Sequence, residues 1–167
     1  MAIEQNTTTL FIPGLRPIYD RLSIYTGVLL RIVTGAVMIP HGYQHYFGRQ
    51  TLPEWFSGVE PSAAPEFGAG LEPFTEFLAS QGYEPAYMWA LLITFVQFFG
   101  GILLVFGLFT RLAAAAIAIF LFVAIFQVVG QSSGSWEMPL LWCTASLIFV
   151  VCGGGRFSVD YMIGKEL

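Results

Sequence analysis

Arg31 is the only Arg, Lys, Asp or Glu between Leu22 and Phe47, so it is the first residue that suggests chemistry. A charge at the centre of a membrane-spanning helix costs about 2.5–3.5 kcal/mol on insertion scales, and such residues are usually paired or functional. One interpretation is a structural cation that bonds to main-chain carbonyls or to Asp160. The alternative is an arginine that contacts an anion or a quinone oxygen in a pocket.

His41 and His45 are the two histidines of the chain, and they follow Pro40 in the same apolar stretch. Four-residue spacing places both on one face of a helix, where they can hold a single metal ion. No second cluster of His, Cys or carboxylates accompanies them in the sequence. We therefore predict no metal site, with this pair as the only candidates for one. A quinone hydrogen bond and structural hydrogen bonding are the alternatives.

Gln97 is a polar residue in the middle of another apolar stretch. An intramembrane amide usually bonds to a neighbouring helix, and a ligand contact is the alternative. With Arg31 and His41 it forms our candidate set for a quinone or lipid pocket. Small residues allow helix backbones to approach closely. We predict structural roles for five residues: Gly35, Gly100, Gly101, Arg111 and Asp160.

Motifs for covalent or nucleotide chemistry do not accompany these residues, and we predict no catalytic residue. The glycines at 153–155 lack the Lys-Ser/Thr of a phosphate-binding loop, and they predict a helix end. Cys143 and Cys152 are nine residues apart, which is about 13.5 Å along a helix. A disulfide needs closer Cα atoms, so both cysteines are interpreted as packing residues.

The elements that must position these residues are long apolar helices. The chain is 56% hydrophobic and 11% charged, whereas soluble domains carry about 25% charged residues. From Tyr87 to Gly130, 44 residues contain one charged side chain, Arg111. As a single helix they would measure about 66 Å, twice the thickness of a bilayer core. Two helices that fold back at Thr110-Arg111 fit this stretch.

We predict an all-α fold, a polytopic four-helix membrane bundle in residues 22–155. The predicted spans are 22–47, 87–109, 112–129 and 138–155, between tails at 1–21 and 156–167. Pro13-Gly14 and Arg16-Pro17 are expected to keep the first tail irregular. Cations favour the cytoplasmic side. Both termini are therefore predicted to be cytoplasmic, on the side that holds Arg16, Arg21, Arg111, Arg156 and Lys165.

The connection at 48–86 is long, rich in proline and acidic, with six glutamates and one cation, Arg49. Within it, residues 71–80 predict a short helix with Phe74, Phe77 and Leu78 on one side, which suits a position on the membrane surface or across the bundle end. Loops of this length are usually functional. We expect this outer loop to contact partner subunits.

Three segments in order resemble the DoxX family of small four-helix membrane proteins. They are the Arg31–Gly35 stretch with His41-Gly42, the stretch from Gln97 to Ala114, and the closing segment 155–160. Family members commonly carry Glu where this chain has Gln97 and Lys where it has His45. The resemblance implies a membrane redox complex, because members are associated with quinol oxidase, thiosulfate:quinone oxidoreductase and oxidative-stress complexes.

From these observations we expect an accessory or structural subunit of a larger membrane complex, respiratory or photosynthetic, that is not catalytic on its own. The alternatives are a quinone-binding subunit of a membrane oxidoreductase and a small transporter. Quinone is the one cofactor under consideration. The expected partners are the lipid bilayer and other membrane subunits. Seven scattered Lys and Arg residues argue against nucleic acid. The resemblance and the helical pattern imply a multi-pass protein of the bacterial inner membrane.

Overall fold

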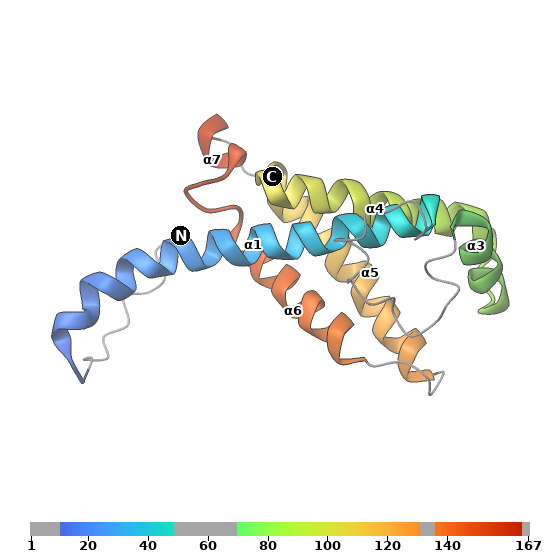
Figure 1. Ribbon diagram of the computed structural model, residues 1–167, viewed down its shortest axis with the longest axis horizontal. Coiled ribbons are helices and arrows are strands. Elements are labelled where there is room, and N and C mark those ends of the chain that lie inside the picture. Colours follow the sequence, from blue (N-terminus) through green and yellow to red (C-terminus); the bar gives the residue numbers. More distant parts are fainter. Residues whose placement is uncertain (1–10, 49–69, 131–135, 165–167) are drawn as a thin grey trace.

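The computed structural model describes residues 11–48, 70–130 and 136–164, and every regular element within these ranges is a helix (Figure 1). A 3₁₀ turn, η1, at Pro13–Leu15 precedes the helices. The helices are α1 (Arg16–Phe47), α3 (Leu71–Ser80), α4 (Ala86–Phe106), α5 (Thr110–Gly130), α6 (Glu137–Cys152) and α7 (Val159–Ile163).

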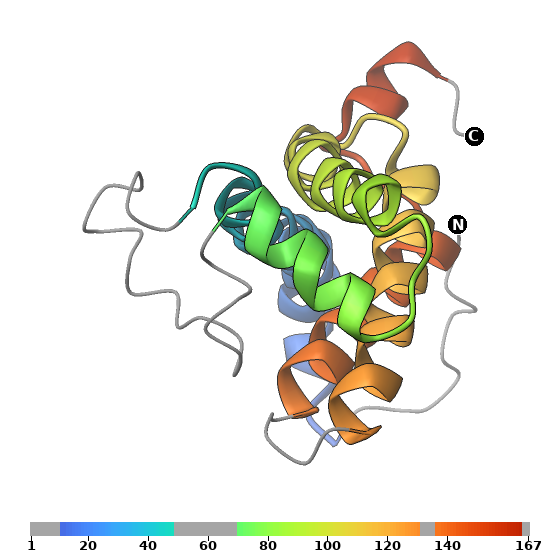
Figure 2. The same ribbon diagram turned by 90° about the vertical axis from the view of Figure 1, so that its right-hand side faces the viewer.

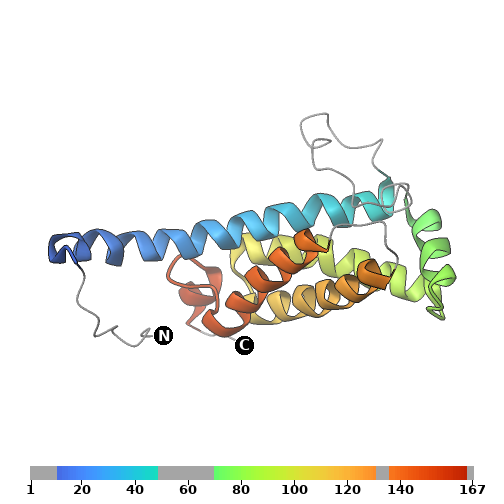
Figure 3. The ribbon, with the colours of Figure 1, turned by 90° about the horizontal axis from the view of Figure 1, so that it is seen from below.

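Four long helices, α1, α4, α5 and α6, form the bundle. α1 packs mainly on α4, α5 packs on α6, and α4 contacts α5 (Figure 3). By length and composition α1 and α4 can each cross a membrane, whereas the apolar stretches Thr110–Phe126 and Glu137–Cys152 are shorter. An all-helical fold is thus observed, and the count of four spans stays a prediction.

The start of α1 differs from the prediction. The helix begins at Arg16, six residues before the expected span, and η1 precedes it directly, so residues 13–21 are not an irregular tail. Pro17 lies in the first turn of α1. There a missing N–H removes no helical hydrogen bond, so proline is tolerated. The helix also continues through Pro40.

The turn between α4 and α5 lies at residues 107–109, just before the predicted reversal at Thr110-Arg111. α4 ends at Phe106. Its C-cap, Gly107, is left-handed (φ 70°, ψ 41°) and donates its N–H to the carbonyl of Leu103 at 2.8 Å. Phe109 also has a positive φ of 49°. α5 begins at Thr110, so Arg111 lies in its first turn and not at the point of reversal. The glycine, which favours this conformation, sets the position of the turn.

α3 is the short helix expected in the long connection, with the predicted bounds. Its Phe74 and Leu78 are buried, whereas Glu72 and Glu76 are exposed. α3 lies across the ends of α1 and α4 (Figure 2). The bundle therefore has an α3 end and, opposite it, an α7 end. Residues 49–69 of the expected loop and the polar turn at 131–135 lie outside the described residues.

Glycines bring α1 and α4 together. A Cβ on Gly35 would lie 2.6 Å from the carbonyl oxygen of Gly101, and one on Gly42 would lie 2.5 Å from the main-chain nitrogen of Phe98. Real side chains cannot occupy that space, so this crossing requires glycine. Gly100 faces Ile117 of α5 at a looser 3.2 Å, and a Cβ on Gly27 would meet nothing within 4 Å.

Both cysteines are free thiols, as the spacing predicts. Cys143 is buried in α6, and its Sγ lies 3.5 Å from the carbonyl oxygen of Ala118 in α5. Cys152 is exposed at the end of α6. The packing interpretation therefore fits Cys143, and nothing in the structure gives Cys152 a packing role.

Candidate functional site

Arg31 is buried at the α7 end of the bundle, where it reaches the chain beyond α6. Its exposed fraction is 2%. Nη1 donates to the carbonyl of Gly154, and Nη2 donates to the carbonyl of Phe157 at 2.8 Å. Nε has no hydrogen-bond partner. This is the arrangement that the structural interpretation of Arg31 predicts, because two main-chain carbonyls receive the guanidinium.

Asp160 is the buried anion of the same region, with 3% of its surface exposed. One carboxylate oxygen accepts from the main-chain N–H of Phe109 at 2.8 Å. The other accepts from both the N–H and the hydroxyl of Thr110, each at 2.8 Å. The carboxylate thus caps the positive end of the α5 dipole. It also attracts Arg31 electrostatically.

Two glycines make room for this arrangement. A Cβ on Gly107 would overlap Nη1 of Arg31, and one on Gly154 would lie 2.6 Å from the hydroxyl of Thr110. Ser158 caps α7 by accepting from the N–H of Tyr161 at 3.1 Å. We call this set the α7 junction; its members are Arg31, Gly107, Phe109, Thr110, Gly154, Phe157, Ser158 and Asp160.

The α7 junction ties α1, the α4–α5 turn and the end of α6 into one unit. Its carboxylate oxygens and both terminal guanidinium nitrogens are already bonded within the protein. The N–H of Asp160 also donates to the carbonyl of Gly107 at 3.0 Å. A reactive site needs charged groups that can reach a substrate, and these groups are committed to main-chain partners. The arrangement is that of a structural clasp.

The two histidines lie near the α3 end. Nδ1 of His41 is 2.7 Å from the carbonyl of Val37. A carbonyl only accepts, so this nitrogen carries the proton and Nε2 of a neutral ring is an acceptor. His45 is buried and stacks on Phe74 of α3, with ring centroids 4.3 Å apart. Within the described part of the chain, no group of three His, Cys, Asp or Glu side chains that could hold a metal is present.

Three uncharged polar side chains are buried in α1 and α4 without the partners that burial normally demands. The amide nitrogen of Gln44, the hydroxyl of Thr94 and the amide oxygen of Gln97 have no hydrogen bond in the structure. All three residues are less than 8% exposed. We call them the α1–α4 polar group; Gln44 and Thr94 lie toward the α3 end, and Gln97 lies near the middle of α4. Interhelical hydrogen bonding, the structural interpretation of Gln97, is not observed for its amide oxygen.

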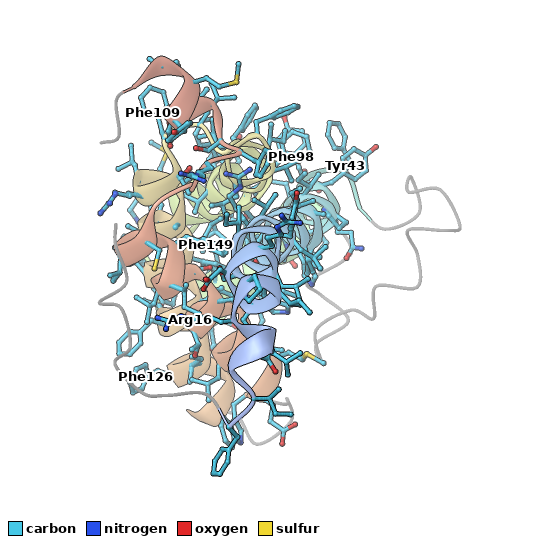
Figure 4. The ribbon with its side chains drawn as sticks, turned by 90° about the vertical axis from the view of Figure 1, so that its left-hand side faces the viewer. Arg16, Tyr43, Phe98, Phe109, Phe126 and Phe149 are labelled. Atoms are coloured by element: carbon cyan, nitrogen blue, oxygen red, sulfur yellow. The ribbon has the colours of Figure 1, made fainter. Side chains whose placement is uncertain are left out.

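A groove of about 590 Å³ opens between α1 and α4 beside this group. Of the three residues in the group, only Thr94 lines the groove. Aromatic side chains form most of the groove wall. Tyr43 and Phe98 face each other there with ring centroids 6.5 Å apart (Figure 4). The accessible wall of the groove is apolar, and the unbonded hydroxyl of Thr94 is buried behind it, so the groove suits a lipophilic ligand.

The structure does not bring the predicted pocket residues together. Arg31 precedes His41 by ten residues on one helix, which is about 15 Å along its axis. Arg31 belongs to the α7 junction, whereas His41 lies toward the α3 end and Gln97 lies near the middle of α4. None of the three lines the α1–α4 groove. Thr94, which does, was not singled out in the sequence, because a lone threonine in an apolar helix carries no distinctive pattern.

The DoxX family model matches residues 27–130, more than half of the chain. The chain belongs to the DoxX family. It is therefore a membrane protein, which agrees with its apolar helices. No curated protein and no solved structure matches the chain.

The DoxX match separates the α7 junction into two parts. Arg31, Gly107 and Thr110 lie within the matched residues, whereas Gly154, Ser158 and Asp160 follow them. The closing segment 155–160 supplies the carboxylate and the carbonyl of Phe157 for the matched part, and Gly154 just before it supplies the other carbonyl. Sequence reasoning missed Gly107, Thr110 and Gly154 as contacts of Arg31 or Asp160. A buried arginine and a Ser-x-Asp segment were the available signals.

Proposed function

We propose that this DoxX protein is an accessory or structural subunit of a larger membrane complex of respiratory or photosynthetic redox machinery. The observation that carries the proposal is the α7 junction. Among the described residues, the Arg and Asp side chains buried in the fold are Arg31 and Asp160, and both bond to the main chain. Charged groups that serve the fold in this way are not available for catalysis.

The proposed position is a multi-pass protein of a bacterial inner membrane with both termini in the cytoplasm. The α7 end carries Arg16 and Arg21 at the start of α1, Arg111 at the start of α5 and Arg156 after α6. This distribution supports a cytoplasmic α7 end by the positive-inside rule. Reporter fusions at the two termini should both report the cytoplasm, and opposite sides would contradict the orientation.

The partner surface proposed here is the outer connection between α1 and α4. Its described part, α3, presents Glu72 and Glu76 to the surroundings. Exposed carboxylates that have no described salt bridge suit a partner with basic residues. They affect association and specificity more than folding.

Purification of the tagged chain from native membranes in a mild detergent tests the proposal. Stoichiometric partner subunits should accompany it, and a lone chain would contradict an accessory role. The double charge reversal Glu72→Lys with Glu76→Lys should reduce partner recovery several-fold. Glu137→Lys is the matched control, because Glu137 is an exposed acid at the same end of the bundle on α6. Equal loss in both variants would reject α3 as the contact.

A second candidate, a quinone-binding subunit, is favoured by the α1–α4 groove. A quinone has a lipophilic body and ring oxygens that accept hydrogen bonds. The hydroxyl of Thr94 has no hydrogen bond and is buried behind the apolar wall of the groove, and we propose that it donates one when a quinone displaces that wall. Quinone should copurify with the protein after mild extraction. The amount that copurifies should fall several-fold in Thr94→Val. Thr144→Val is the control, because Thr144 is an exposed threonine on α6. Equal quinone content in both variants would reject the groove as its site.

A further inference from the structure

A second groove, of about 520 Å³, lies between α4 and α5 and is bordered by α3. We call it the α4–α5 groove. α4 and α5 touch where Gly100 faces Ile117, and next to this contact Val96 and Ala116 line the groove. Toward the end of the bundle that α3 crosses, Phe74 and other inner side chains of α3 form its border (Figure 2). The groove is therefore closed at its deep end and has walls from three helices.

The length of the α4–α5 groove suits an acyl chain. It runs along α4 from Trp89 to Val96 and along α5 from Ala116 to Ala124. At about 1.5 Å per residue these stretches measure about 10 Å and 12 Å. One leaflet of a bilayer core is about 15 Å deep. A groove parallel to the helices thus covers most of the depth of one leaflet.

The open side of the groove is apolar and faces outward from the bundle. Leu92, Ile119 and Val123 line it and are 51%, 67% and 43% exposed. In a membrane protein, exposed apolar side chains on long apolar helices contact lipid tails. An acyl chain can therefore enter the groove from the side without crossing water.

Two amphipathic aromatic residues line the groove at the α3 end. Tyr83 precedes α4 and Trp89 lies in its first turn, with ring centroids 6.1 Å apart. Tyrosine and tryptophan concentrate at the headgroup level of membranes, because each ring has an apolar body and a polar tip. This end of the groove therefore suits a lipid headgroup, and the closed end suits the chain.

The charge around this end favours one kind of headgroup. Glu84 is exposed and directly follows Tyr83, and Glu72 and Glu76 are exposed on α3. Among the described residues, no Lys or Arg lies at the α3 end. Carboxylates repel an anionic headgroup and accept hydrogen bonds from an ammonium group. An ethanolamine headgroup supplies such an ammonium, with three N–H donors.

We propose that the α4–α5 groove binds one ethanolamine phospholipid, with an acyl chain between α4 and α5 and the ammonium group near Glu84. The site depends on neither the proposed accessory role nor the α1–α4 groove.

Native mass spectrometry of the full chain tests the site. The protein is reconstituted into vesicles that contain equal amounts of phosphatidylethanolamine and phosphatidylglycerol with the same acyl chains. It is then extracted in a mild detergent and washed, so that only retained lipid is counted. Phosphatidylethanolamine should be retained at five-fold or more the level of phosphatidylglycerol. No retained lipid, equal amounts of the two, or a preference for phosphatidylglycerol would overturn the proposal.

Filling the groove should release the lipid. Ala116→Phe places a ring among the lining side chains and should lower retained phosphatidylethanolamine five-fold or more. Ala115→Phe is the matched control, because Ala115 is the neighbouring alanine of α5, is also partly exposed and does not line the groove. Equal retention in the two variants, or equal loss, would reject the groove as the site.

Reversing the charge at the headgroup end tests the site without altering its apolar wall, so this measurement does not depend on the folding of Ala116→Phe. Glu84→Lys should abolish or reverse the preference for phosphatidylethanolamine. Glu137→Lys makes the same charge change at an exposed acid of α6 and should keep the preference. An unchanged preference in Glu84→Lys, or the same change in both variants, would overturn the assigned headgroup.

Discussion

Both ends of the bundle bury polar side chains, but the two sets differ in how completely their polar atoms are hydrogen-bonded. At the α7 end, Arg31 bonds to two carbonyls of the segment after α6, and Asp160 bonds to two N–H groups at the start of α5. Of their side-chain polar atoms, only Nε of Arg31 has no partner. In the α1–α4 polar group, Gln44, Thr94 and Gln97 are as deeply buried, yet each leaves a polar atom unbonded. Bonded polar groups hold a fold together, whereas unbonded ones lower its stability.

The difference suggests a division of roles along the bundle. A buried charge needs hydrogen-bonding partners, because leaving it alone costs several kcal/mol. An uncharged amide or hydroxyl costs less when unbonded, about 1–3 kcal/mol, and a protein can tolerate it where a ligand supplies the partner. The charged end is therefore assigned to structure. The uncharged region beside the α1–α4 groove is where we propose that this DoxX protein accepts a molecule from the membrane.

The largest expected effect is at Asp160. Asp160→Ala removes three hydrogen bonds from the start of α5 and leaves Arg31 buried without its neighbouring anion. Breaking a buried charge arrangement costs about 3–5 kcal/mol. Thermal unfolding in detergent should show a Tm lower by about 10 °C, at about 2–4 °C per kcal/mol for a chain of this size.

Asp20→Ala is the matched control for this change, because Asp20 is an exposed aspartate near the start of α1. Its Tm should shift by no more than about 1–2 °C, since exposed substitutions change stability by about 0.5 kcal/mol. Equal shifts in the two variants would remove the structural role assigned to the α7 junction.

A smaller effect, opposite in sign at two positions, is expected for glycines of α1. Gly35→Ala places a Cβ 2.6 Å from the carbonyl of Gly101, and forcing α1 from α4 should destabilise the protein by about 1–3 kcal/mol. Gly27→Ala meets nothing within 4 Å and should stabilise α1 by about 0.5–1 kcal/mol. Tm values of the two variants should move in opposite directions. A lower Tm for Gly27→Ala would mean that the part of α1 around Gly27 is packed.

The sequence predicts more of the fold than of the candidate site. Long apolar runs predict helices because length and hydrophobicity are local properties, and α3 was predicted with its observed bounds for the same reason. The structural interpretation of Arg31 also followed from a general rule, since a charge in an apolar helix requires partners. Which carbonyls receive it depends on how the chain returns after α6, and no local pattern encodes that path.

The misplaced elements show the same limit. The sequence predicts the reversal at Thr110-Arg111, where the one charge of the run lies, but the left-handed Gly107 sets the turn. Residue type predicts a pocket of Arg31, His41 and Gln97, and the fold separates Arg31 from the other two. Thr94 acquires interest only through what surrounds it, namely the groove and its unbonded hydroxyl.

The smallest expected effect completes the comparison of the two ends. Gln97→Leu replaces a buried amide whose oxygen has no partner by an apolar side chain of similar volume. Removing an unbonded polar group is nearly neutral or stabilising, so the change should lie between no effect and about 1 kcal/mol of added stability. Asp160→Leu makes a comparable polar-to-apolar change at the α7 end and should destabilise. Thermal unfolding of both variants under one detergent condition measures the contrast. A destabilised Gln97→Leu would mean that the amide already has a partner in the membrane, and the α1–α4 polar group would then be structural as well.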